Sequence, residues 1–195
     1  MTLVLASTSA TRRAMLANAG VAHEAVASFV DEKAEKEAFH HLAARDLADA
    51  LAELKAVKVS RARGGALVLG SDQTLELSDG ARLDKPGEGG VAAQLRRLSG
   101  QRHTLHAAAV VAEDGVPVWR HVGSTRLWVR PLSEAFIAHY VDACGAAVAG
   151  SVGGYHAEGL GAQLFERIEG DWFNILGLPL LPLLAWLRER GVVQI

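Results

Sequence analysis

The sequence has little cysteine, no long hydrophobic run and no excess of charge of either sign. Its single cysteine, Cys144, has no intrachain partner for a disulfide, so we expect a small buried apolar residue there rather than a reactive thiol. The most apolar stretch, 175–187, has about 13 residues and contains two prolines, whereas a membrane span needs about 20. The first apolar residues precede the arginines, the reverse of a secretory leader. We therefore expect a cytoplasmic protein without a membrane partner.

The charge balance excludes one large class of partner. The chain has 20 basic and 22 acidic residues, a net charge of −2, whereas a protein that coats a nucleic acid polymer needs a basic surface. A local basic pocket for one anionic ligand remains compatible with this sum. The length of 195 residues and a hydrophobic content of 50% predict a single domain over residues 1–195.

Helical and strand patterns alternate along the chain, which predicts the α/β class with a mixed sheet. Segment 33–63 indicates one long helix or two shorter ones, and 145–161 is glycine-dense and irregular. We expect an extended segment at 21–30, strands at 2–6, 66–70, 74–78, 103–112, 117–129 and 163–168, and helices at 12–19, 91–98, 134–143 and 179–190.

The first strand, loop and helix favour a phosphate site. Free amide groups and the positive end of the helix dipole at such a loop attract an anion. Ser7 and Ser9 add donors, and Arg12 and Arg13 add charge-assisted hydrogen bonds. Taken alone, the unit also fits an ordinary capped helix with solvated arginines. Neither the Walker loop nor the Gly-x-Gly-x-x-Gly fingerprint occurs in the chain.

Carboxylates follow two apolar extended segments. Asp72 comes after the strand expected at 66–70, and Glu32 comes after the extended segment 21–30. Ligands of α/β sheets bind at strand ends, and two or three carboxylates there can hold one divalent ion. Each carboxylate alone also fits a turn or a helix cap. The histidine pairs His40–His41 and His103–His106 do not share a face, which argues against a histidine metal site.

Two lysines and a glycine-rich segment complete the candidates. Lys55 lies on a helix and Lys85 in a loop, and by composition either is equally a solvated lysine. The segment 153–161 has glycines that permit close approach of the backbone to a ligand. A flexible surface loop is an equal interpretation of that segment.

The order of these features resembles the Maf family of nucleoside triphosphate pyrophosphatases over nearly the whole chain. Seven short motifs fall in one order, which is far more specific than any of them alone. They are Leu5–Leu16 (LASTSATRRAML), Val30–Glu32, Ala52–Ala56, Gly70–Gln73, Lys85–Pro86, Leu98–Gly100 with His103, and Gly154–Gly161, followed by Gly170 and Asn174–Leu180.

The resemblance implies hydrolysis of a nucleoside triphosphate between its α and β phosphates, with a divalent cation such as Mg²⁺ or Mn²⁺. It also implies an elongated mixed sheet with flanking helices and two lobes around a nucleotide cleft. Carried over by position, Asp72 is the general base or a metal ligand, and Glu32 helps to hold the metal. The remaining implied ligands, which cradle the triphosphate, are Ser7, Arg12, Arg13, Lys55 and Lys85.

In the family that the chain resembles, residues at three further positions distinguish the subgroups that act on nucleotides with different bases. The subgroup acting on 7-methyl-GTP has a bulky residue (often Trp), Gln and Glu where this chain has Thr11, Gln73 and Glu158. The subgroup acting on dTTP and UTP has Arg, Thr and Gln there. Gln73 and Glu158 favour 7-methyl-GTP, because a carboxylate accepts from the N–H donors of a cationic guanine. Thr11 fits neither subgroup and removes a stacking surface, and Ala10 replaces the usual proline.

Two alternatives stay open beside this interpretation. The dTTP/UTP activity is the first, and a nucleotide-binding regulator of septum formation without turnover is the second. The presence of Asp72, Glu32, Lys55 and Lys85 together favours catalysis, since a pure binder needs no carboxylate aimed at the triphosphate. The long hydrophobic β segments also suggest a homodimer as a hypothesis.

Overall fold

The computed structural model describes residues 3–194, in which seven strands form one mixed sheet. The order across the sheet is β2-β1-β3-β5-β6-β7, and β4 pairs with β3. The strands are β1 Leu3–Leu5, β2 His23–Ala25, β3 Leu67–Leu77, β4 Arg82–Leu83, β5 Arg102–Glu113, β6 Val116–Val129 and β7 Phe165–Glu169. The predicted α/β class with a mixed sheet is confirmed.

The sheet changes from parallel to antiparallel across β3. Strand β1 runs parallel to both β2 and β3, while β3, β5, β6 and β7 pair antiparallel. The expectation of separate strands at 66–70 and 74–78 is wrong, because β3 continues unbroken through both. Pairing with β1 stops at Leu69, but pairing with β5 continues from Val68 to Leu77. A long partner strand therefore keeps β3 extended beyond the end of β1.

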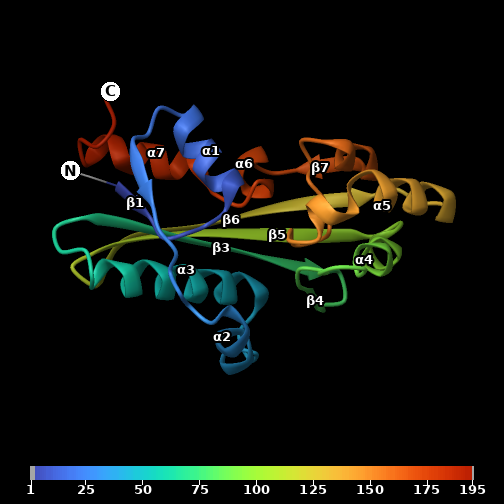
Figure 1. Ribbon diagram of the computed structural model, residues 1–195, viewed down its shortest axis with the longest axis horizontal. Coiled ribbons are helices and arrows are strands. Elements are labelled where there is room, and N and C mark those ends of the chain that lie inside the picture. Colours follow the sequence, from blue (N-terminus) through green and yellow to red (C-terminus); the bar gives the residue numbers. More distant parts are fainter. Residues whose placement is uncertain (1–2, 195) are drawn as a thin grey trace.

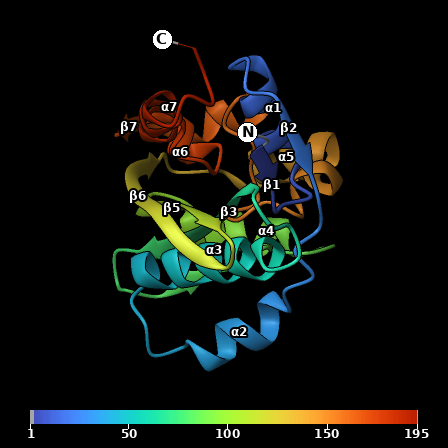
Figure 2. The same ribbon diagram turned by 90° about the vertical axis from the view of Figure 1, so that its left-hand side faces the viewer.

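Helices cover both faces of the sheet (Figures 1 and 2), with α3 against one face and α1, α6 and α7 against the other. In both views α2 lies beyond α3, away from the sheet. Within residues 3–194, no helix has both the length and the apolar character that a membrane crossing requires. The helices are α1 Ala10–Asn18, α2 Glu32–Ala38, α3 Ala44–Ser60, α4 Val91–Leu98, α5 Glu134–Val148, α6 Trp172–Ile175 and α7 Leu180–Glu189, with a 3₁₀ turn at Leu160–Leu164.

Local sequence explains most helix ends. Helix α1 begins two residues earlier than predicted because the Ser9 hydroxyl caps it, accepting from the Arg12 amide at 3.3 Å. The segment 33–63 forms two helices, one of the two alternatives. Helix α2 has no buried residue, whereas α3 buries a stripe that includes Leu47 and Leu51.

The hairpin of β5 and β6 turns between the two segments that were expected as strands. Asp114 and Gly115 both adopt positive φ angles, 50° and 80°, which matches the twist of the two flanking strands. These two strands form the long axis of the sheet in Figure 1. The extended segment expected at 21–30 is a strand only at His23–Ala25, because β2 pairs with the three residues of β1 alone.

Two large apolar clusters lie along the sheet. One packs Leu75, Leu105 and Tyr155 with helices α4 and α5. The other packs Leu3 and Leu69 with helices α1 and α7. Between them the sheet carries polar side chains, and this is where the candidate site lies.

Candidate active site

A cavity of about 620 Å³ opens between the two apolar clusters. Its wall is assembled from seven parts of the chain. These are the β1–α1 loop, the segment between β2 and α2, helix α3, strand β3, the loop at Lys85, and the segments 147–158 and 175–177. The cavity gathers all but one of the site residues that the sequence predicts.

The ammonium group of Lys55 lies at the centre of the site. Its Nζ donates to Asp72 Oδ1 at 2.5 Å and to Glu32 Oε1 at 2.6 Å. Lys55 and Asp72 are only 4% and 5% exposed, so neither charge is well solvated. Because a buried charge is stable only when it is paired, each of these groups depends on the other.

The packing of α3 on β3 brings Lys55 and Asp72 together. At Gly70 an added Cβ would lie 2.1 Å from the carbonyl oxygen of Ala52 and 2.6 Å from the amide of Ala56. The absence of a side chain at Gly70 therefore lets helix and strand approach backbone to backbone. Asp72 is inside β3 and not beyond its end, but it follows the point where β1 stops pairing. Its side chain is consequently accessible from the carboxyl end of β1.

Glu32 reaches the site as the first residue of α2. Asp31 before it caps that helix, accepting from the Ala34 amide at 3.1 Å. Burial alone would raise the pKa of Glu32, but the Lys55 ammonium and its hydrogen bond, with Lys85 and Lys36, lower that pKa to about 2. Lys85 Nζ lies 3.5 Å from Glu32 Oε2.

Arg12 and Ser7 lie side by side in the cavity wall. Arg12 Nε donates to the Gly177 carbonyl at 2.8 Å, and its Nη1 donates to Ser7 Oγ at 3.4 Å. These bonds fix the guanidinium plane and leave its other N–H groups for a ligand. Burial lowers the pKa of Arg12, and Asp72 and Glu32 offset part of that effect.

Arg13 is the predicted site residue that lies elsewhere. It is exposed on α1 and is not part of the cavity wall, although Thr11 and Arg12 are. On a helix, successive residues point about 100° apart, so Arg12 and Arg13 cannot share one face. Of the two arginines, Arg12 is the one that lines the cavity.

Gln73 has a fixed amide orientation. Its Nε2 donates to the carbonyls of Asn174 and Ile175 at 2.7 and 3.1 Å. The amide oxygen is therefore the atom that Gln73 presents as an acceptor, and the residue lines the cavity. Glu158 lines it as well and is exposed. Two acceptor side chains thus lie in the wall with Thr11.

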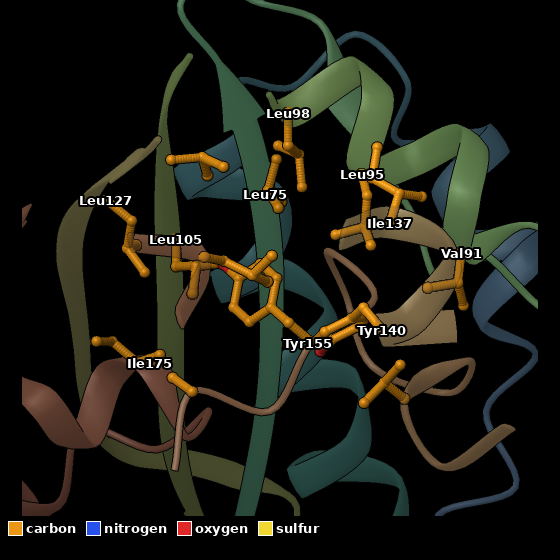
Figure 3. Close-up of a cluster of buried hydrophobic side chains, with 14 of the residues drawn as sticks. Leu75, Val91, Leu95, Leu98, Leu105, Leu127, Ile137, Tyr140, Tyr155 and Ile175 are labelled. Atoms are coloured by element: carbon orange, nitrogen blue, oxygen red, sulfur yellow. The ribbon is translucent and has the colours of Figure 1, made fainter. Parts of the chain in front are cut away.

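The glycine-rich segment is anchored by a tyrosine. Figure 3 shows Tyr155 in the apolar cluster that also holds Leu75, Leu105 and Tyr140. The Tyr155 hydroxyl lies 2.6 Å from His103 Nε2, and burial lowers the pKa of His103 to about 4. His103 is therefore neutral near pH 7 and serves as a hydrogen-bond partner inside the core. This anchor holds the segment that carries Glu158.

Two cavity residues were missed by sequence reasoning. Lys36 bonds both oxygens of Asp84, at 2.8 and 2.9 Å, and lines the cavity. It follows Glu32 by four residues, a spacing that puts both on one helix face and was a usable signal. Phe29 also lines the cavity, and nothing in its sequence context indicated this.

The carboxylates of Asp72 and Glu32 fit a divalent ion whose remaining ligands come from a substrate and water. Lys55 engages one oxygen of Asp72 and one of Glu32, and Lys85 lies 3.5 Å from the second oxygen of Glu32, so a metal would share these carboxylates with the two lysines. Within residues 3–194, no three His, Cys, Asp or Glu side chains are arranged as a complete metal site. Mg²⁺ commonly takes one or two carboxylates and completes its shell with phosphates and water, which matches this donor set.

Comparison with known proteins decides the family. The family described as Maf-like protein matches residues 2–190 of the chain. The chain belongs to the Maf family. The resemblance seen in the short motifs is therefore confirmed, and the mixed sheet agrees with it.

Several Maf relatives are similar over their full length. A nucleoside triphosphate pyrophosphatase of Sphingopyxis alaskensis is 50% identical, and the match covers 98% of each chain. A nucleoside triphosphate pyrophosphatase of Hyphomonas neptunium is 53% identical over 99% of this chain and 98% of its own. A 7-methyl-GTP pyrophosphatase of Rhizobium meliloti is 50% identical over 98% of each.

The low pKa of Glu32 predicts an acid-sensitive contribution to stability. A folded pKa of about 2, below the ordinary value, means that the unfolded chain binds the proton more readily. The stabilisation is complete above pH about 5 and is lost as the pH falls towards about 2. We expect Glu32→Gln to make the free energy of unfolding less dependent on pH in this window, as measured by urea denaturation at several pH values.

Glu37→Gln is the matched control, since Glu37 is exposed on the same helix. It should leave the pH dependence as in the wild type. A Glu32→Gln variant with the full wild-type pH dependence would contradict the ion pair with Lys55.

Proposed function

We propose that this protein hydrolyses nucleoside triphosphates between the α and β phosphates, releasing a nucleoside monophosphate and pyrophosphate. The observation that carries the proposal is the Asp72–Lys55–Glu32 cluster, which shares one cavity with Arg12 and Lys85. The relatives named nucleoside triphosphate pyrophosphatase support it.

The cations of the cavity match a polyphosphate. Arg12, Lys85 and Lys36 come from three different elements and line the same wall. In phosphoryl transfer, negative charge accumulates on the phosphate oxygens and on the leaving group. Fixed cations stabilise that charge without reorganising during the reaction. Arg12 is held in place by its bonds to Gly177 and Ser7.

Asp72 is suited to accept the proton of the attacking water. One of its oxygens is held by Lys55, which orients the carboxylate and leaves the other oxygen for a water. As the oxygen of this water attacks the α phosphorus, the bond from the α phosphorus to the bridging oxygen breaks and pyrophosphate leaves. The proton passes to the Asp72 carboxylate. A divalent ion held by Asp72 and Glu32 would supply further charge neutralisation on the phosphates.

We favour 7-methyl-GTP as the substrate over dTTP and UTP. Gln73 presents an amide oxygen and Glu158 a carboxylate in the cavity wall. Guanine offers two adjacent N–H donors, and methylation at N7 adds a positive charge that a carboxylate stabilises. The relative from Rhizobium meliloti named 7-methyl-GTP pyrophosphatase supports this choice.

A pyrophosphate-release assay tests the activity. With Mg²⁺ or Mn²⁺, the wild type should release pyrophosphate, and Asp72→Asn should reduce kcat by about 100- to 10,000-fold, the usual contribution of general base catalysis. The variant should still bind nucleotide. Asp142→Asn, an exposed aspartate on α5, is the control and should keep wild-type turnover.

Two results would overturn the proposal in different ways. Absence of pyrophosphate release from all of 7-methyl-GTP, dTTP, UTP and CTP would remove the enzymatic function and leave a nucleotide-binding regulator. Full turnover by Asp72→Asn would remove Asp72 from the chemistry.

Substrate choice is tested by Glu158→Gln. Loss of the carboxylate should reduce kcat/KM for 7-methyl-GTP about tenfold relative to UTP, since a hydrogen bond to a charged group contributes about 1.5–3 kcal/mol. Glu166→Gln, exposed on β7 and outside the cavity wall, should leave the ratio of the two substrates unchanged. An unchanged ratio in Glu158→Gln would contradict the assigned role.

A further inference from the structure

Phe29 is an exposed aromatic residue in the wall of the cavity. Its exposed fraction is 83%, while the next most exposed large apolar residue, Val116, reaches 61%. Phe29 lies between β2 and α2, three residues before Glu32. Leaving so much of an aromatic ring in water forgoes the free energy gained by burying it, which suggests that the ring serves a ligand.

The backbone of Phe29 is also unusual. Its φ angle is 51°, in the left-handed region that a bulky residue rarely adopts. Asp114 is the other non-glycine residue of 3–194 with a positive φ, and the β5–β6 turn explains it. Lys58 of α3 donates to the Phe29 carbonyl. Surrounding contacts that hold a costly conformation are typical of binding sites.

The other rings of the cavity wall are already engaged. Tyr155 is 5% exposed and packs edge-on against Phe165 at 5.0 Å between ring centroids. His156 uses Nε2 for a hydrogen bond with Ser151 Oγ at 2.8 Å. Thr11, in the same wall, has no ring. Phe29 is therefore the most exposed aromatic ring of the wall.

We propose that the ring of Phe29 is the stacking surface for the base of the bound nucleotide. This inference rests on the proposed function and adds a specificity-determining residue to it. Stacking of a base on an aromatic side chain contributes about 1–3 kcal/mol, and a cationic ring such as 7-methylguanine gains more from a π face. The cations of the cavity bind the phosphates, and Phe29 binds the planar base.

Three substitutions separate the ring from its bulk. Phe29→Leu keeps an apolar side chain without a ring, Phe29→Ala removes both, and Phe29→Trp keeps an aromatic face. All three are non-glycine residues, so the backbone strain at this position stays comparable. We expect Phe29→Leu and Phe29→Ala to raise KM for 7-methyl-GTP about 5- to 50-fold with kcat within about twofold of the wild type. Phe29→Trp should keep or lower KM.

Inorganic triphosphate provides a ligand without a base. Its inhibition constant should be the same in the wild type and in Phe29→Leu, because the cations that bind it are unchanged. In Phe29→Trp, 7-methyl-GTP should quench the fluorescence added by the new indole, and inorganic triphosphate should not. Leu181→Ala removes another exposed apolar side chain, on α7, and should change none of these values.

The outcomes distinguish this inference from the proposed function. If the wild type releases pyrophosphate but Phe29→Leu keeps the wild-type KM, the stacking role is wrong and the activity stands. Equal weakening of 7-methyl-GTP and inorganic triphosphate would also contradict stacking, because it would place the effect at the phosphates. An inactive wild type would instead refute the function itself.

Discussion

The pairing of Lys55 with Asp72 and Glu32 is the interaction on which the site depends. Lys55 comes from α3, Asp72 from β3 and Glu32 from α2, so one ammonium group joins three elements. Lys55 and Asp72 are almost fully buried, and an isolated charge there would be strongly unfavourable. The close approach of α3 to β3 at Gly70 makes the pairing geometrically possible. The same ion pairs therefore hold the three elements together and form the centre of the site.

Helix α2 is attached to the rest of the protein mainly by charge. It has no buried residue, and its contacts include Lys55 to Glu32 and Lys36 to Asp84. The segment before it is held by Lys58 at the Phe29 carbonyl. One wall of the cavity thus depends on lysines, and a polyanionic ligand would compete with those carboxylates for the same lysines. The position of α2 and of the segment before it is accordingly expected to depend on the charge of a bound ligand.

Sequence reasoning succeeded where local chemistry decides the structure. Helix Val91–Leu98 has the predicted bounds, and the turn at Asp114–Gly115 follows from residues that tolerate positive φ. Sequence reasoning failed where contacts between segments distant in the chain determine the structure. Asp72 lies within β3 because β5 extends that strand. Arg13 was a separate error, because successive helix residues point about 100° apart and only Arg12 lines the cavity. The family resemblance brought Glu32, Lys55, Asp72 and Lys85 together, which spacing alone did not. Lys36 of α2 and Phe29 just before that helix were recognised from the structure, although the four-residue spacing of Lys36 from Glu32 was a usable signal.

A double-mutant cycle on Lys55→Met and Asp72→Asn tests the central pairing most directly. Each single substitution leaves a buried polar partner, and Lys55→Met should lower the free energy of unfolding by about 3–5 kcal/mol. Because the double variant leaves no buried charge at this contact, its loss should be smaller than the sum of the two single losses by at least about 1 kcal/mol. Losses that add within about 0.5 kcal/mol would show that Lys55 and Asp72 act independently, and would contradict the account of a site organised by their pairing.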